Sequence, residues 1–374
     1  MYNIPSITKE FSMRHFLRAI LLSCFFLLSN VCVGMSVRDL HNGDLEVYGV
    51  YGSITVSDEL LQRIIRSPEF TRLQGVHQYG AWNYVIGPSS YTRWHHSLGV
   101  FYLTVAYGGT YLEQIAALLH DVSHTVFSHA GGWIYHNDYM SADKHQDDIH
   151  LWFLSHSGIA RLLAEYGISM YDVHHKCGSF FVLEQPLPDI CADRLDYNLQ
   201  GAYLDGMLSS DDIMRILQGL HHENGQWYFD DITLAREFAQ LSLFMTRNIW
   251  GGPVNGILNY MLGKMLRRGL DIGILTSDDI HFSEDVSVWN ILNASDDSEI
   301  MRDMFMLRRY QALFFFDDLA YDMWVQAKFR GINPLVNTAE TVSRLSTCDP
   351  EFARLYDEVK QDVTYGWPIR CLIK

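Results

Sequence analysis

Apolar residues recur at helical spacing through most of the chain, and this pattern predicts a mainly helical protein. Gly, Pro, Asn and Ser interrupt the runs often, which favours many helices of ordinary length. The first expected helix is capped by Ser57 and ends before Pro68. The others are expected at residues 96–106, 111–121, 147–165, 188–204, 210–220, 234–249 and 254–268.

Two short segments alternate apolar and polar residues instead. One covers residues 44–56, and the other covers residues 222–233 around Asn224-Gly225. Both are predicted as small β-hairpins on an otherwise α-helical fold. No internal repeat and no linker rich in Pro or Ser divides the chain. We therefore expect one main domain over residues 44–250 and a helical C-terminal lobe over residues 251–374.

The N-terminal segment reads as a leader. Arg14 and Arg18 precede an apolar run of fifteen residues, 19–33, which ends in small residues and is short for a membrane span. Residues 1–34 are therefore predicted as a signal peptide, which makes the protein periplasmic or secreted, with no transmembrane anchor in the mature chain. The alternative is a misassigned start, with Met35 opening a cytoplasmic protein.

The net charge and the number of histidines limit the functions that the sequence allows. The 28 basic residues face 44 acidic ones, for a net charge of −16, which disfavours stable nucleic-acid binding. Of the 17 histidines, twelve lie between His77 and His175. Such a cluster indicates metal or proton chemistry. An acidic protein that handles a phosphorylated ligand needs local positive charge, and a bound cation would supply it.

One set of residues has the composition of a metal site. His96, the pair His120-Asp121, and Asp193 fall on or beside three separate expected helices. Two imidazoles and two carboxylates can hold a divalent ion and leave positions open for water and a phosphate oxygen.

The order of these residues resembles the metal signature of the HD-domain phosphohydrolases. Residues 70–73, 78–80, 93–99, 120–129, 193–197 and 246–248 further resemble the branch that contains the deoxynucleoside triphosphate triphosphohydrolases. The similarity covers about residues 44–255. It implies an HD-domain helical fold and an HD-type phosphohydrolase domain within the expected 44–250 segment.

The resemblance also implies roles for individual residues. His96, His120, Asp121 and Asp193 would bind one divalent metal ion, which could be Mn, Fe, Mg or Zn. Arg93, His124 and His129 would face the phosphates, and His124 and His145 would be catalytic. Arg194 and Arg247 would add phosphate contacts, while Tyr197 and Gln78 would contact the sugar. The expected substrate is a small phosphorylated compound, a nucleoside di- or triphosphate, hydrolysed by a metal-activated water. The sequence leaves a homo-oligomer open.

The chain departs from that pattern at the nucleotide-reading positions. The Asp expected three residues after His129 is Gly132, and the Asp that reads the sugar 3′-hydroxyl is Gly201. His145 is followed by Gln146 where Glu is usual. The His and Tyr expected after Arg247 are Gly251 and Asn255. We therefore expect weak discrimination between deoxyribose and ribose.

Two other functions remain open at this stage. A dinuclear iron oxygenase of the same fold would use His145 with His174 or His175 as additional metal ligands. A non-catalytic protein could keep the metal for structure and bind a nucleotide, which the three glycine substitutions would allow. Among the remaining polar residues, Asp196 is expected to cap or pair with a neighbouring helix, and His150 and His156 to be packed, hydrogen-bonded core residues.

Overall fold

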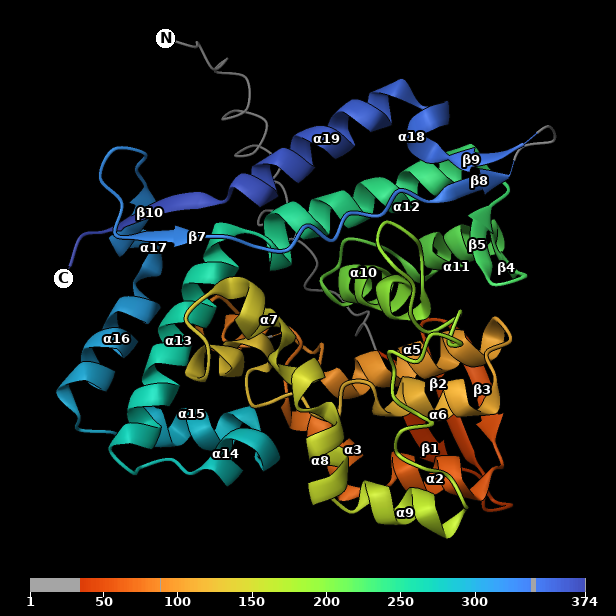
Figure 1. Ribbon diagram of the computed structural model, residues 1–374, viewed down its shortest axis with the longest axis horizontal. Helices are drawn as coiled ribbons and strands as arrows, with labels where there is room; N and C mark the ends of the chain where they lie inside the picture. Colours follow the sequence, from red (N-terminus) through yellow and green to blue (C-terminus); the bar gives the residue numbers. More distant parts are fainter. Residues whose placement is uncertain (1–33, 88, 338–340, 374) are drawn as a thin grey trace, which may run out of the picture. The chain divides into compact units, whose positions relative to one another are not determined.

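The protein is described by a computed structural model that covers residues 34–87, 89–337 and 341–373. These residues lie in one compact unit, Gly34–Lys374. Helices dominate this unit and the sheets are small, which confirms the predicted fold class (Figure 1). The expected leader falls, apart from Gly34, outside the described residues. Within the described ranges, no helix combines the length and apolar character that a membrane crossing requires.

The N-terminal hairpin is confirmed and gains one strand. The three strands pair antiparallel in the order β1-β2-β3, with Tyr48 of β2 opposite Ser36 on one side and Ser53 on the other. Their bounds are β1 (Ser36–Asp39), β2 (Leu45–Gly49) and β3 (Gly52–Val56). Leu45, Val47 and Val56 are buried, so this sheet covers one side of the main hydrophobic core.

Three helices carry most of the polar residues predicted to form a site: α5 (Arg93–Ala106), α6 (Tyr111–Leu119) and α10 (Ala192–Leu204). Thr92 caps α5 and Thr110 caps α6, each by accepting a hydrogen bond from a backbone N–H in the first turn. Helix α5 packs against both α6 and α10. This packing brings the start of α5, the end of α6 and the start of α10 together.

The remaining helices of the N-terminal half are short. They are α2 (Glu59–Ile65), α3 (Pro68–Thr71), η1 (Arg72–Gly75), α4 (Trp82–Val85), η2 (Ser128–Ile134), α7 (Tyr139–Asp148), α8 (His150–His156) and α9 (Ile159–Glu165). The prediction of a single helix over residues 147–165 is wrong. Ser157 has extended backbone angles, φ −109° and ψ 179°, and separates α8 from α9. Helix α10 likewise begins at Ala192 and not at Pro188.

The C-terminal half confirms the second hairpin, β4–β5, and the long helix α13. Its helices are α11 (Ser210–Gln218), α12 (Ile232–Met245), η3 (Thr246–Trp250), α13 (Pro253–Asp271), α14 (Ser277–Phe282), α15 (Asp285–Asn293), α16 (Ser298–Arg308), α17 (Tyr310–Leu313), α18 (Leu345–Cys348) and α19 (Pro350–Tyr365). Its strands are β4 (Leu220–Glu223), β5 (Gln226–Phe229), β6 (Phe314–Phe316), β7 (Met323–Val325), β8 (Leu335–Asn337), β9 (Val342–Arg344) and β10 (Trp367–Cys371).

Segments on either side of residue 250 share secondary structure. Strand β5 pairs in parallel with β8, so that Tyr228 lies opposite Leu335, within a sheet of order β4-β5-β8-β9. Helix α19 lies along α12, and the extended chain between β7 and β8 also runs beside α12 (Figure 1). This extended chain carries Lys328 and Arg330. The boundary expected at residue 250 stays a prediction.

Candidate metal centre

Four polar side chains from α5, α6 and α10 converge as the sequence predicts. The Nε2 atom of His96 lies 3.1 Å from Nε2 of His120 and 3.0 Å from Oδ1 of Asp193. Oxygens of Asp121 lie 3.6 Å from the Nε2 atoms of both His96 and His120. His120 Nε2 is also 3.8 Å from Asp193 Oδ1. His96, His120 and Asp121 are buried, and Asp193 is partly buried.

The orientation of the two imidazole rings fits a metal ion. His96 Nδ1 donates to Asp196 Oδ2 at 2.7 Å, and His120 Nδ1 donates to the carbonyl oxygen of Ala117 at 2.8 Å. In the neutral rings these bonds place the proton on Nδ1, so each Nε2 carries a lone pair. The two Nε2 atoms are 3.1 Å apart. Two lone pairs at that separation repel unless a cation or a proton lies between them.

The carboxylates around His96 create a strong preference for positive charge. Burial by itself lowers the pKa of His96, but hydrogen bonds to Asp193 and Asp196 and the charge of Asp121 raise that pKa to about 10. The centre therefore favours a cation, either a proton on His96 or, with the ring neutral, a divalent ion. A set of two imidazoles and two carboxylates suits Mn, Fe or Zn by ligand type.

Asp196 pairs with a neighbouring helix, as the sequence predicts, and its partner there is the metal ligand His96. It is fully buried and accepts hydrogen bonds from Tyr51, Tyr91 and Gln200 at 2.8–2.9 Å in addition to its bond with His96. Asp196 therefore orients a metal ligand instead of capping a helix. A side chain at Gly99 would place its Cβ 1.8 Å from Asp196 Oδ1, so the glycine makes room for this contact. The signal in the sequence was its spacing of three from Asp193 on one helical face.

Arg93 and His124 extend the polar network from the metal centre. Arg93 is buried and donates to Asp121 Oδ2 at 2.7 Å and to Ser128 Oγ at 2.9 Å. His124 Nε2 lies 3.3 Å from Asp121 Oδ1. Burial and the nearby Arg93 charge lower the pKa of His124 to about 3, so its ring is neutral at pH 7. The buried Nδ1 atom of His124 has no hydrogen-bond partner within the part of the chain that the structure describes.

The four predicted ligands line a cavity of about 270 Å³. Its wall combines six cationic side chains with five carboxylates, whereas the protein as a whole is strongly acidic. The cationic side chains that line it are Arg93, Lys144, Lys176, Arg194, Lys328 and Arg330. Of these, sequence reasoning singled out only Arg93 and Arg194. Lys328 and Arg330 enter from the extended chain between β7 and β8, and no motif marks them in the sequence.

A carboxylate from α7 stands beside His129. Asp143 Oδ1 lies 3.5 Å from His129 Nδ1, and both Asp143 oxygens accept hydrogen bonds from Arg330 at 2.8 and 2.7 Å. Gly132 makes this arrangement possible, because a Cβ there would lie 2.1 Å from the carbonyl oxygen of Ala142. The absent side chain thus lets α7 approach η2 closely and delivers Asp143 to the cavity.

Aromatic side chains form another part of the cavity wall. The ring of Tyr197 meets that of Trp250 edge-on with centroids 5.1 Å apart, and Tyr79 lies next to Trp250. A Cβ on Gly201 would lie 2.8 Å from the Tyr79 hydroxyl, so Tyr79 fills the space that a side chain at residue 201 would need. Gln78 and Asn255 also line the cavity. Trp250 was not predicted from the sequence, where it stands in no motif.

Two residues that the sequence assigned to the site lie elsewhere. His145 is on α7 but does not line the cavity; it stacks on Tyr135, with ring centroids 4.5 Å apart. Asp143, Lys144, Gln146 and Asp147 occupy the cavity side of that segment. Arg247 pairs with Glu358 and Asp362 of α19, the latter at 2.5 Å. Glu358 and Asp362 neutralise Arg247 outside the cavity, so the structure does not bring His145 or Arg247 to the metal centre.

Comparisons with known proteins agree with this geometry. The model of the HD domain family matches residues 93–197, which include all four predicted metal ligands. The uncharacterized protein YdhJ of Bacillus subtilis is 32% identical over 287 residues, which cover 77% of this chain and 86% of YdhJ. The metal-dependent phosphohydrolase cns2 of Cordyceps militaris is 28% identical over 68% of this chain and 74% of its own length.

More distant similarities cover a shorter segment or the fold alone. The deoxynucleoside triphosphate triphosphohydrolase SAMHD1 of Bos taurus is 38% identical over 85 residues, which are 19% of this chain and 14% of that protein. The crystal structure of a hypothetical protein from Aquifex aeolicus superposes with a TM-score of 0.60 at 18% identity. That superposition covers 87% of this chain and 99% of the Aquifex chain, so the two share a fold.

Proposed function

Because the chain belongs to the HD domain family, we propose that it is a metal-dependent phosphohydrolase whose substrate is a nucleoside di- or triphosphate. One observation carries this proposal. The His96, His120, Asp121 and Asp193 centre opens on a cavity that combines cationic side chains with an aromatic wall. Cations match the charge of a phosphate chain, and aromatic rings match the face of a sugar or base.

A divalent ion held by the four ligands would polarise a phosphoryl oxygen and lower the pKa of the attacking water. The protein contributes the surrounding charge and proton transfer. Arg93 already holds Asp121, and its guanidinium has further N–H groups for a phosphate oxygen. His124 is neutral, and its Nδ1, which has no hydrogen-bond partner among the described residues, offers a lone pair to a hydrogen-bond donor on the substrate or the attacking water.

His129 is the residue that we assign to proton donation. Desolvation in the cavity lowers the pKa of His129 to about 4, whereas the Asp143 carboxylate acts in the opposite direction. An anionic phosphate bound nearby would add to the effect of Asp143 and favour the protonated ring. Protonated His129 could then stabilise or protonate the leaving oxygen. Sequence reasoning gave the donor role to His145, which lies outside the cavity.

The number of cationic side chains in the cavity favours a substrate with more than one phosphate group. Arg93, Lys328 and Arg330 come from separate segments and line the same cavity. Arg194 is partly engaged, because it donates to the carbonyl of Gln185 at 2.6 Å and pairs with Glu184 at 3.1 Å. Asp121 holds Arg93 and Asp143 holds Arg330, but each guanidinium has further N–H groups that can reach a second phosphate. A di- or triphosphate chain would contact them together.

The same cavity supports weak discrimination at the sugar. Gly201 supplies no carboxylate, and the space beside it is filled by the ring of Tyr79, whose hydroxyl donates to Asp205 at 3.0 Å. Strong discrimination requires a buried polar group that the wrong sugar leaves unpaired. Gln78 and Asn255 remain as uncharged polar side chains of the cavity wall, and the buried Oε1 of Gln78 has no hydrogen-bond partner among the described residues. We expect ribonucleotides and deoxynucleotides to be hydrolysed at similar rates.

The test is a substrate panel with the purified full chain. Nucleoside mono-, di- and triphosphates in ribo and deoxy forms are incubated with Mn²⁺, Fe²⁺, Mg²⁺ or Zn²⁺, and both nucleoside and phosphate products are measured. The Asp121→Ala variant controls for contaminating phosphatases, and His156→Ala serves as a matched histidine substitution on the surface.

We expect turnover of di- or triphosphates that depends on added metal and disappears in Asp121→Ala. Turnover of monophosphates alone would contradict the polyphosphate assignment. Strict selectivity for one deoxynucleotide would contradict the weak sugar discrimination. A metal-loaded protein that releases no product from any member would contradict the phosphohydrolase assignment.

A further inference from the structure

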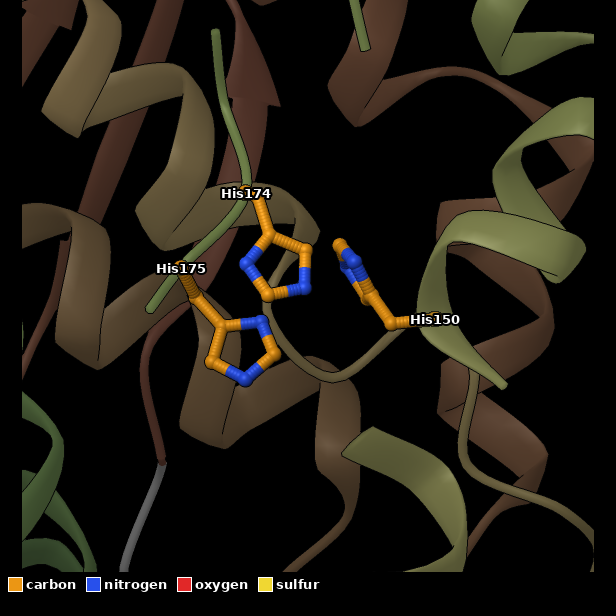
Figure 2. Close-up of side chains that lie close together, drawn as sticks. All are labelled: His150, His174 and His175. Atoms are coloured by element: carbon orange, nitrogen blue, oxygen red, sulfur yellow. The ribbon is translucent and has the colours of Figure 1, made fainter. Parts of the chain in front are cut away.

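Three histidines converge outside the metal centre. His150 opens α8, and His174 and His175 lie in the loop that follows α9. Figure 2 shows the three rings turned toward a common space. One ring nitrogen from each residue lies within 4.8 Å of the others. The rings of His150 and His175 are nearly perpendicular, with centroids 4.8 Å apart.

Two of these rings already have a protein acceptor on the nitrogen that faces away. His150 Nε2 donates to the carbonyl oxygen of Leu119 at 2.9 Å. His175 Nε2 lies 3.3 Å from Asp147 Oδ1. Metal-binding histidines typically have such an outer acceptor, which fixes the ring and leaves the other nitrogen as a lone pair.

The inward nitrogens are buried acceptors that the protein leaves unused. His150 is 0% exposed and His175 is 5% exposed. Neither Nδ1 atom has a hydrogen-bond partner among the described residues. Burial, with the neighbouring His175, lowers the pKa of His150 to about 3, so protonation does not satisfy its Nδ1 at pH 7. Leaving a buried acceptor unpaired destabilises the fold, and a bound cation would satisfy it.

We propose that His150, His174 and His175 form a second metal site, which takes an imidazole-preferring divalent ion of the Zn²⁺ type. Three neutral imidazoles with a fourth position left to water are a common zinc ligand set. In tetrahedral zinc sites the nitrogens are about 3.3 Å apart, so the three rings need to move inward by only about 1 Å. His174 completes the set from the rim. Figure 2 shows its Nε2 on the side that faces His150, while its Nδ1 accepts a long 3.3 Å hydrogen bond from the backbone N–H of Lys176. Binding the ion through Nε2 would move the ring proton to Nδ1 and replace that hydrogen bond.

The proposed site is distinct from the first centre but connected to it. It shares no ligand with the group formed by His96, His120 and Asp121. The Leu119 carbonyl that holds His150 belongs to the residue before His120. Asp147, which holds His175, also pairs with Lys176 at 2.6 Å, and both residues line the substrate cavity. A metal at this site would fix the Lys176 loop against α8 at the edge of that cavity.

Metal stoichiometry tests the proposal without relying on activity. The full chain is stripped with a chelator, reloaded with Zn²⁺ and desalted, and bound zinc is measured by elemental analysis. We expect about two equivalents for the wild type and about one for the His174→Ala/His175→Ala double variant. Asp121→Ala, altered only at the first centre, should also keep about one. His156→Ala, an exposed histidine on α8, is the matched control and should keep two.

Loading with Co²⁺ gives a second readout, because the visible absorption of the three-histidine site should disappear in the double variant and persist in Asp121→Ala. Circular dichroism of the metal-free proteins checks the fold. If the double variant does not fold, the single His174→Ala variant should bind the second zinc at least tenfold more weakly. One zinc per wild-type chain, or two in the double variant, would overturn the proposal. Lack of phosphohydrolase activity would not affect this result.

Discussion

The Oδ1 atom of Asp143 lies 3.5 Å from Nδ1 of His129. Asp143 is 4% exposed, and Arg330 donates to both of its oxygens, so the carboxylate has little freedom to turn away from the imidazole. His129 Nδ1 has no hydrogen-bond partner among the described residues, so at this distance the carboxylate acts on the imidazole through its charge, which stabilises the protonated form. Asp143 therefore acts as a positioning residue for His129, and Arg330 positions Asp143.

The first prediction concerns this pair. Asp143→Asn should lower kcat by about 10–100-fold with little change in KM, because the amide keeps the size of the side chain but cannot stabilise a protonated His129. The limb of the pH–kcat profile that reports His129 should move to lower pH. Steady-state kinetics from pH 5 to 9 measure both effects, and metal content should equal that of the wild type. An unchanged pH profile would mean that Asp143 only supports the fold.

The same residue predicts a pH-dependent stability. Burial alone raises the pKa of Asp143, but the charges of Arg330, His129 and Lys328 lower that pKa below its usual value. A depressed pKa stabilises the fold above the unfolded-state pKa of about 3.9, and the stabilisation is lost as the pH falls through the folded-state value.

Asp143→Asn leaves the partly buried Arg330 without its anionic partner, so the free energy of unfolding at pH 7 should fall by about 2 kcal/mol, the scale of hydrogen bonds to a charged group. The difference from the wild type should hold down to about pH 5 and shrink below about pH 4. Urea unfolding at a series of pH values measures it. A difference that grows as the pH falls would contradict the assigned direction of the pKa shift.

The metal half of the site could be predicted from the sequence because its ligands stand in order in one continuous region. His120-Asp121 and Asp193 lie at the ends of helices whose periodicity is clear, and the packing of α5 on α6 and α10 follows from their apolar faces. The two hairpins could also be predicted, because apolar and polar residues alternate along their strands and turn-forming residues separate the strands.

The substrate half could not be predicted in the same way. Lys328 and Arg330 lie in an extended segment without periodicity. Strand pairings between distant parts of the chain, β7 with β10 and β8 with β5, hold the two ends of that segment, which lines the cavity. The resemblance to the HD-domain phosphohydrolases assigns His145 to the site by its position in the sequence alone. The helical phase of α7 turns Asp143 and Gln146 inward and leaves His145 beside Tyr135. Neighbouring residues of a helix point in different directions, and the sequence pattern does not show which of them faces the cavity. For this reason His145 was assigned to the site although its neighbours occupy it.

The second prediction separates metal ligands from the residues that orient them. Asp121→Ala should abolish metal binding at the first centre, since it removes one of four ligands and leaves Arg93 without its partner. Asp196→Asn should weaken binding by about 10–100-fold without abolishing it, because it disturbs only the hydrogen bond that orients His96. Calorimetric titration with Mn²⁺ measures both affinities. Full occupancy in Asp121→Ala would refute the assigned ligand set.

The third prediction compares two cationic residues as phosphate contacts. The sequence implies this role for Arg247, whereas the structure places Lys328 in the cavity. Lys328 lines the cavity, whereas Arg247 pairs with Glu358 and Asp362 on α19. Lys328→Ala should raise KM for the triphosphate about tenfold, the effect of losing one charge-assisted contact. Arg247→Ala should change KM less than twofold. Kinetics on the best substrate of the panel decide the matter, and a larger effect from Arg247→Ala would restore the role that the sequence implied for it.

The last prediction concerns Gly132, the position where the resemblance to the triphosphohydrolases implies an Asp that orients a catalytic histidine. Restoring that residue by Gly132→Asp should lower activity, although it makes the local sequence more typical of the family. A Cβ at residue 132 would lie 2.1 Å from the carbonyl oxygen of Ala142 and 2.8 Å from its carbonyl carbon, and these backbone atoms cannot rotate away. Helix α7 would have to move outward and would carry Asp143 away from His129.

Gly132→Ala separates this steric effect from the added charge, because it introduces the same Cβ without a carboxylate. We expect both variants to lose at least tenfold in kcat, to unfold at lower temperature than the wild type, and to keep the first metal, whose ligands lie on other elements. Thermal unfolding, metal analysis and kinetics on the two variants test this together. If Gly132→Asp matched the wild-type rate, the new carboxylate would be serving His129, and Asp143 would not be the residue that replaces it.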